Sequence, residues 1–340
     1  MTIAEKRDAL IADFLARNGW GAAERRLLAG DASFRRYDRL VRNGESAVLM
    51  DAPPPHEDVR SFERIDRLLL DLGLSAPRPF GMDADAGLLL LEDLGDRTFT
   101  RALAAGDDEA SLYRLAVDLL IALHRRCAHE SRHSFLPAYD DRRLLDEALL
   151  FTDWYLPAIT GEEVTQERRQ AYVAAWEAVL PVARRVPESL VLRDYHVDNL
   201  MVLADREGVA ACGLLDFQDA VIGPVSYDLV SLLEDARRDV SPAVVEAALE
   251  RYLSAFPDLE AECFLASYAV LGAQRNAKII GIFSRLCRRD GKPQYLQHIP
   301  RVWRLLEADL AHAALAPVRA WLDETVPPSC RRAPRPEVGP

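Results

Sequence analysis

The feature of this sequence that most limits its fold is a change of pattern near Asp93. Before it, short apolar runs alternate with turns, and the Asn-Gly pair at 43–44 is a strong signal for a β-hairpin. After it, long stretches carry apolar residues at helical spacing. Only three short runs there have a strand-like pattern: 189–192, 200–203 and 211–215. The sequence therefore predicts an α+β fold, with a small antiparallel-sheet lobe followed by a large, mainly helical lobe.

The predicted division of the chain follows from that change. With 340 residues, nearly half of them apolar, the chain can form two medium-sized cores. The end of the chain is basic and rich in proline, a composition typical of a loose segment. The expected parts are a first lobe over 1–94, a second lobe over 95–325 and a flexible tail over 326–340.

Two polar segments beside predicted strands carry the chemistry. Asp194 stands five residues before Asn199 in a loop, and Asp216 follows seventeen residues later at the end of another apolar run. Phosphoryl transfer needs one carboxylate to accept a proton and further oxygens to hold Mg²⁺ against phosphates. Asp and Asn are common in ordinary turns, which is the alternative interpretation. The spacing of the pair, with each segment beside a strand, favours a phosphotransferase site.

Charge and composition exclude several classes of partner. The net charge of −12 argues against nucleic acid and anionic membranes, since both need a basic surface. No apolar run is long enough to cross a bilayer. The five cysteines form no paired motif, which fits a reducing compartment. We therefore expect a cytoplasmic monomer that acts on small molecules.

At these motifs the chain resembles the aminoglycoside phosphotransferase and choline kinase group of kinase-like enzymes. The D-x-H-x-x-N loop at 194–199 and the D-F-x-D segment at 216–219 carry the resemblance, which covers most of the chain. Within that group it is most similar to kinases that phosphorylate the anomeric hydroxyl of N-acetylmuramate and N-acetylglucosamine. Four further stretches carry this closer likeness: 30–37, 48–54, 91–96 and 274–283.

The resemblance implies a bilobal, protein-kinase-like fold with ATP, or alternatively GTP, bound between the lobes. It implies that Asp194 is the catalytic base and that Asn199 and Asp216 hold Mg²⁺. The acceptor would be an amino sugar of the cell wall, and the process would be peptidoglycan recycling.

The nucleotide contacts follow from position and resemblance. Gly30 and Ser33 lie in the hairpin that covers the phosphates in such enzymes, and backbone groups around Glu92 and Leu94 would bind the base. Kinases usually grip the phosphates with a lysine on the third strand. No lysine occurs between Lys6 and Lys278, so an arginine must replace it or the phosphates rely on metal and backbone. Arg35 and its neighbour Arg36 are the candidates, and only one of them can face the site.

The acceptor is expected to be small, because only 11 residues separate Asp216 from Asp228 and leave no room for a long activation loop. Arg275 and Lys278 share one face of a predicted helix and would suit the lactyl carboxylate of N-acetylmuramate. Ordinary helix salt bridges are the alternative for these two residues. His196 is expected to order the loop or to contact the substrate. In relatives the equivalent of Asp228 supports the catalytic loop from behind.

Two other functions stay open at this point. The first keeps the chemistry and changes the acceptor to an aminoglycoside, choline or another amino alcohol. The second is a nucleotide-binding pseudokinase, which the missing lysine favours and the complete set of Asp194, Asn199 and Asp216 disfavours.

Overall fold

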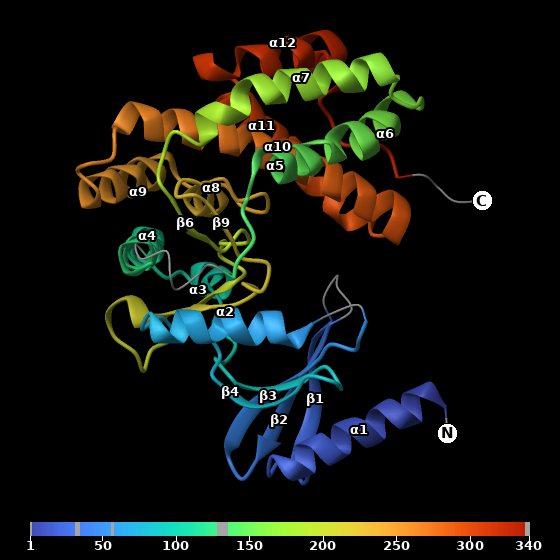
Figure 1. Cartoon of the computed structure of the whole chain (residues 1–340), viewed down its shortest axis with the longest axis vertical. Helices are drawn as coiled ribbons and strands as arrows, with labels where there is room; N and C mark the ends of the chain where they lie inside the picture. Colours follow the sequence, from blue (N-terminus) through green and yellow to red (C-terminus); the bar gives the residue numbers. More distant parts are fainter. Residues whose placement is uncertain (1, 31–34, 56–57, 128–134, 337–340) are drawn as a thin grey trace. The chain divides into compact units, whose positions relative to one another are not determined.

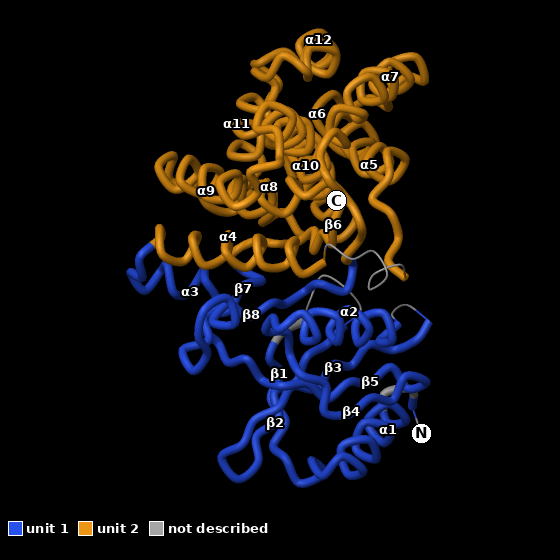
Figure 2. Tube along the Cα trace, turned by 60° about the vertical axis from the view of Figure 1, so that its left-hand side comes forward, with its two compact units in different colours: residues 1–108, 198–219 blue, residues 109–197, 220–340 orange. Residues whose placement is uncertain are grey.

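The computed structural model contains two compact units (Figure 2). Unit 1 comprises residues 1–108 and 198–219, and unit 2 comprises residues 109–197 and 220–340. Each unit has its own buried apolar core. The structure describes residues 2–30, 35–55, 58–127 and 135–336.

Unit 1 is built on a five-stranded antiparallel sheet with the strand order β1-β2-β3-β5-β4 (Figure 1). The predicted hairpin joins β2 to β3, with Arg42 opposite Glu45. Both turn residues have positive φ, 50° at Asn43 and 84° at Gly44, as a two-residue hairpin requires. The strands are β1 (Glu24–Gly30), β2 (Arg36–Arg42), β3 (Glu45–Asp51), β4 (Pro79–Asp83) and β5 (Leu88–Glu92).

Alternation along the strands gives the sheet two different faces. On one face, Leu40, Leu49 and Leu90 pack with Phe14 of helix α1 (Ile3–Arg17) in the unit 1 core. A capping box in which the Thr2 hydroxyl accepts from the Glu5 N–H begins that helix. The other helices of the unit are α2 (Val59–Asp71) and α3 (Phe99–Ala104).

A small hairpin from much later in the chain also belongs to unit 1. It consists of β7 (Leu200–Val202) and β8 (Cys212–Leu214), joined through a 3-10 turn, η3 (Gly208–Ala211). Leu214 N–H donates to the Ser75 carbonyl at 2.7 Å, and Val202 N–H donates to the Arg97 carbonyl at 2.8 Å. Because these bonds join positions 139 and 105 residues apart, no local sequence pattern could predict them. The expected division after residue 94 stays a prediction.

Unit 2 is mainly helical. Its longest helix, α10 (Ala261–Asp290), contacts α5, α7, α8 and α11. A Cβ at Gly281 would come within 2.3 Å of the Leu150 carbonyl carbon, so only glycine allows this approach. The other helices are α4 (Glu109–Arg126), α5 (Asp141–Ala148), α6 (Leu156–Thr160), α7 (Gln166–Ala183), α8 (Tyr227–Leu233), α9 (Pro242–Ala255), α11 (Ile299–Asp309) and α12 (Ala316–Thr325).

Two short strands cross unit 2, and several short helical turns link its helices. The strands β6 (Glu188–Val191) and β9 (Val221–Pro224) pair antiparallel. The short turns are η2 (Phe151–Tyr155), η4 (Pro293–His298), η5 (Ala313–Leu315) and η6 (Pro328–Cys330).

The predicted α+β class, with a small antiparallel sheet and a mainly helical remainder, is confirmed by the two units together. Among the described residues, no helix is long and apolar enough to span a membrane.

The beginning of the expected tail is held against unit 2. Val326 is buried, and the Tyr155 hydroxyl oxygen lies 3.0 Å from the Cys330 carbonyl oxygen and 2.9 Å from that of Arg332, so its single hydrogen is shared between them. Arg331 forms ion pairs on α11 and α12. The proline-rich composition did not reveal these contacts, because each partner lies far away in the sequence.

Candidate active site

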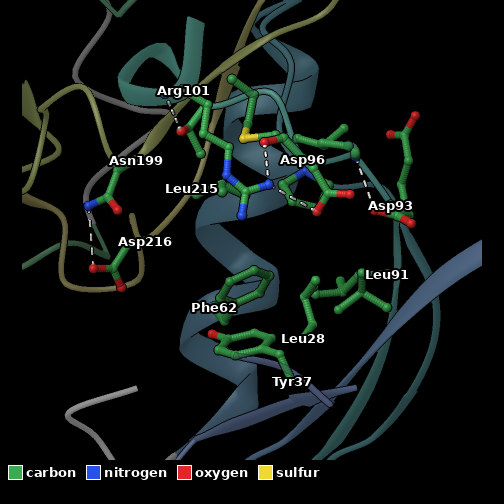
Figure 3. A pocket seen from close by; sticks show the side chains of 17 residues that line it. Leu28, Tyr37, Phe62, Leu91, Asp93, Asp96, Arg101, Asn199, Leu215 and Asp216 are labelled. Atoms are coloured by element: carbon green, nitrogen blue, oxygen red, sulfur yellow. Dashed lines mark hydrogen bonds and ion pairs between the residues drawn. The ribbon is translucent and has the colours of Figure 1, made fainter. Parts of the chain in front are cut away.

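A largely apolar pocket of about 420 Å³ lies within unit 1 (Figure 3). Small-molecule sites commonly have this size and combine apolar walls with a few polar groups. Asn199 and Asp216 lie at one side of the pocket and Asp93 at the other, above the rings of Phe62 and Tyr37. The apolar wall includes Leu28, Tyr37, Val48, Phe62, Leu91 and Met201.

The two predicted metal ligands are brought together in unit 1. Asn199 directly precedes β7, and Asp216 follows closely after β8. Leu215 N–H donates to the Asn199 carbonyl at 2.9 Å, which holds the two strand ends together. The Asn199 amide nitrogen lies 3.5 Å from Asp216 Oδ2. Asp216 has a φ of 58°, a conformation that costs energy for a non-glycine residue and recurs at functional sites.

The donors at Asn199 and Asp216 fit Mg²⁺, which prefers oxygen ligands and keeps several waters. Gln218 Nε2 also donates to Asp216 Oδ1 at 2.9 Å and orients that carboxylate. Within the described parts of the chain, no group of three His, Cys, Asp or Glu side chains could hold a metal ion. An ion at this position would therefore take its remaining ligands from phosphate oxygens and water.

Arg35 is the arginine that lies beside these ligands. Its Nη2 is 3.4 Å from Asp216 Oδ1, and its side chain is 8% exposed. Arg36 is 57% exposed and pairs with a carboxylate on its own strand. Of the two arginines considered as replacements for the missing lysine, the structure therefore brings only Arg35 to Asp216.

Of the other four residues predicted to contact the nucleotide, two line the pocket. Gly30 is the last residue of β1, and Ser33 lies outside the described residues. Glu92 and Leu94 both line the pocket. The Glu92 carboxylate pairs with Arg206 at 2.5 Å, so any contact of this residue with a base would use its backbone.

Sequence reasoning missed a charged rim on the same pocket. Arg39 of β2 forms ion pairs with Asp93 at 2.7 Å and with Asp96 at 2.8 Å. Arg101 donates to the Asp96 carbonyl at 3.0 Å and lines the pocket (Figure 3). These bonds fix the segment that follows β5. The ion pairs of Arg39 depend on the tertiary approach of β2 to that segment, for which the sequence carries no local signal.

In unit 2, the predicted base Asp194 is half-buried on the loop after β6. Burial alone would raise the pKa of its carboxyl group. Lys278 and Arg275, followed by His196 and Arg193, outweigh that effect and hold the pKa of Asp194 below its ordinary value. The carboxylate is therefore ionised at neutral pH and able to accept a proton.

Buried hydrogen bonds fix the loop that carries Asp194. The Asp228 carboxylate accepts the N–H groups of Leu192 at 2.7 Å and Arg193 at 2.9 Å. Burial raises the pKa of Asp228 to about 7. Arg193 has a φ of 70°, which these bonds help to maintain. The structure thus places the Asp228 carboxylate against the backbone that directly precedes Asp194.

The predicted substrate-binding cations have protein partners. Arg275 is 6% exposed, and its Nη2 donates to Ser231 Oγ at 2.8 Å. Lys278 Nζ pairs with Glu147 Oε2 at 2.9 Å. His196 is buried, which lowers its pKa, and it is neutral at pH 7. The salt bridge of Lys278 joins α10 to a glutamate of another helix, α5, and the charge of Lys278 also acts on Asp194.

Glu147 is the residue of this cluster that sequence reasoning missed. Besides Lys278, it pairs with Arg193 and accepts a hydrogen bond from the Tyr139 hydroxyl at 2.5 Å. Burial would raise the pKa of Glu147, but Lys278 and Arg193 bring it below its ordinary value. Glu147 lies three residues after the buried Leu144 on α5, so helical spacing contained the signal for its inward direction.

Comparison with known proteins identifies close relatives along almost the whole chain. It is 40% identical to the N-acetylmuramate/N-acetylglucosamine kinase of Caulobacter vibrioides, over 98% of this chain and 100% of that protein. The kinase of the same name from Pseudomonas aeruginosa is 39% identical over 89% of this chain and 90% of its own length. The one from Neisseria meningitidis is 37% identical, over 88% and 89%.

Solved structures show the same fold at low sequence identity. A choline/ethanolamine kinase family protein from Mesorhizobium loti has a TM-score of 0.62 at 14% identity and covers 94% of this chain and 100% of its own. Wild-type aminoglycoside 2'-phosphotransferase-IIIa, in complex with GDP, has a TM-score of 0.60 at 18% identity, over 90% and 98%. Residues 24–265 match the model of the phosphotransferase enzyme family. The predicted membership is confirmed, and the chain belongs to the phosphotransferase enzyme family.

Proposed function

We propose that this phosphotransferase is an ATP-dependent kinase that phosphorylates the anomeric hydroxyl of N-acetylmuramate and N-acetylglucosamine. The observation that supports it is the match to four kinases of that name, at 37% to 40% identity over 86% to 98% of the chain. The chain also contains Asp194, the proposed base, and Asn199 and Asp216, the proposed oxygen ligands. A cytoplasmic monomer that works in peptidoglycan recycling completes the proposal.

The nucleotide is proposed to bind in the unit 1 pocket. Val48, Leu91 and Met201 offer apolar surface to a purine, and GTP is the alternative donor. Asn199 and Asp216 would hold Mg²⁺, which neutralises charge on the phosphates when bound. Arg35 is proposed to supply the positive charge that the third-strand lysine supplies in other kinases.

The acceptor is proposed to bind beside Asp194 in unit 2. Asp194 takes the proton of the anomeric hydroxyl while that oxygen bonds to the γ-phosphorus. The bond between the γ-phosphorus and the bridging oxygen breaks, ADP leaves, and the product is the α-1-phosphate. The positive charges of Arg275 and Lys278 near Asp194 favour a neutral or anionic acceptor over a cationic aminoglycoside.

A coupled assay of ADP release tests the proposal with both sugars, a panel of aminoglycosides, and choline. We expect turnover with the two sugars, and a phosphorus coupling to the anomeric proton in the product. Turnover with aminoglycosides or choline alone would instead establish the alternative acceptor class. Nucleotide binding without turnover on any acceptor would indicate a pseudokinase.

A further inference from the structure

Lys278, whose charge acts on Asp194, is itself paired with a carboxylate of the protein, Glu147. Its ammonium group lies 2.9 Å from the Glu147 carboxylate, and the two side chains are 13% and 14% exposed. The other oxygen of Glu147 pairs with Arg193, whose side chain is 19% exposed. Glu147 thus compensates two of the cations that act on Asp194.

This pairing changes the acceptor charge that Lys278 favours. A buried, unpaired ammonium group strongly favours an anion, because leaving it without a partner is costly. Paired with Glu147, Lys278 has no such need, and a neutral sugar can bind without leaving an uncompensated charge. An anionic sugar can still share the ammonium group, because the pair is partly accessible.

We propose that Glu147 is a specificity-determining residue that lets one site accept both a neutral and an anionic amino sugar. It acts through Lys278 and Arg193 and takes no part in the chemical step. The inference rests on the proposed function and adds the reason why a lactyl carboxylate is tolerated but not required. The Tyr139 hydroxyl, bonded to the same carboxylate at 2.5 Å, fixes the position of Glu147.

A purely structural role for Glu147 would have a different effect. Arg193 directly precedes Asp194, so loss of its partner could displace the base. Such a displacement would lower kcat/KM for both sugars by the same factor. The ratio of kcat/KM for N-acetylmuramate to that for N-acetylglucosamine therefore separates the two roles.

The test measures this ratio in the full-length enzyme and its variants. In Glu147→Gln the uncompensated cations should raise the ratio by about tenfold, and in Lys278→Gln the ratio should fall by about tenfold. Combining both substitutions should return it to near the wild-type value. Glu147→Asp, which keeps the charge, should stay within about twofold of the wild type. Asp146→Asn, exposed on the same helix, is the matched control and should change nothing.

An unchanged ratio in Glu147→Gln, with both sugars still phosphorylated, would overturn the inference. If that variant does not fold, Lys278→Gln decides alone, and an unchanged ratio there has the same meaning. A wild-type enzyme that phosphorylates neither sugar would overturn the proposed function and this inference with it. Active sugar turnover with unchanged ratios would overturn the inference only.

Discussion

Asp66 of α2 in unit 1 and Glu147 of α5 in unit 2 are both carboxylates on the inner face of a helix, but their surroundings differ. Asp66 is 0% exposed, and neither of its oxygens has a hydrogen-bond partner among the described residues. Burial and the nearby Glu63 and Glu92 raise its pKa to about 7. Glu147 is paired twice, and its pKa lies below the ordinary value.

The same contrast holds for the regions around them. The unit 1 pocket has apolar walls, with its charges at the rim and beside Asp216. The cluster around Asp194 in unit 2 is a network of compensated charges. A planar base can be bound by shape and apolar contact, whereas a polar sugar needs an exact balance of charge and hydrogen bonds. The two regions therefore respond differently to substitution.

The largest effect is expected at the proposed base in unit 2. Asp194→Asn would remove the proposed proton acceptor, and turnover should fall by about 10²- to 10⁴-fold. Since the loop stays tied to Asp228, the thermal unfolding temperature should change little. Steady-state kinetics together with a thermal melt check both expectations, and near-normal turnover would remove Asp194 from its role.

The next largest effect is expected at the proposed metal ligands in unit 1. Asp216→Asn weakens the oxygen pair and should lower kcat/KM by about 100-fold, while raising the Mg²⁺ concentration needed for half-maximal rate. Asp205→Asn, exposed on the same β7–β8 hairpin, is the control. A titration with Mg²⁺ gives the answer, and equal Mg²⁺ dependence in the two variants would exclude Asp216 as a ligand.

A smaller effect is expected for the arginine beside Asp216. Arg35→Met should raise the KM for ATP by about 10- to 100-fold, since a charge-assisted phosphate contact contributes about 1.5–3 kcal/mol. Arg36→Met, at the neighbouring exposed position, should leave KM within about twofold. If both variants show the same KM, Arg35 does not replace the missing lysine.

The smallest effect is expected on folding stability, and it tests whether Asp66, unlike Glu147, is an uncompensated buried carboxylate. Because the folded-state pKa of Asp66 is raised from 3.8 to about 7, stability from its neutral form is present below pH 4 and is lost as pH rises to 7. Asp66→Asn should therefore be more stable than the wild type at pH 8, by about 1–3 kcal/mol.

Urea unfolding at pH 4, 6 and 8 measures that difference, which should shrink toward acid pH. Asp71→Asn, at the exposed end of the same helix, should show no such trend. A difference for Asp66→Asn that is constant across the three pH values would show that Asp66 does not titrate in this range.

Much of the fold was predictable because its signals are local. The Asn-Gly turn and the helical spacing of apolar residues are short-range patterns. The structure has the hairpin at 43–44 and mostly helices after Asp93, as the sequence predicted.

Other features were not predictable because they depend on long-range contacts. The hydrogen bonds that join β8 to Ser75 connect segments that no sequence pattern relates. Arg275 and Lys278 share a helix face, but their partners Ser231 and Glu147 come from two different helices. Helical spacing predicts that these two side chains point the same way. It cannot predict their partners, because those come from other parts of the chain.

The β7–β8 hairpin decides to which unit the candidate site residues belong. Asn199 and Asp216 belong to unit 1, which contains the pocket, whereas Asp194, Glu147 and Lys278 belong to unit 2. A chimaera that exchanges residues 109–197 and 220–340 for those of a relative would thus exchange the proposed acceptor site. It would keep the pocket of unit 1 and the two proposed metal ligands, so we expect acceptor preference and nucleotide binding to change independently.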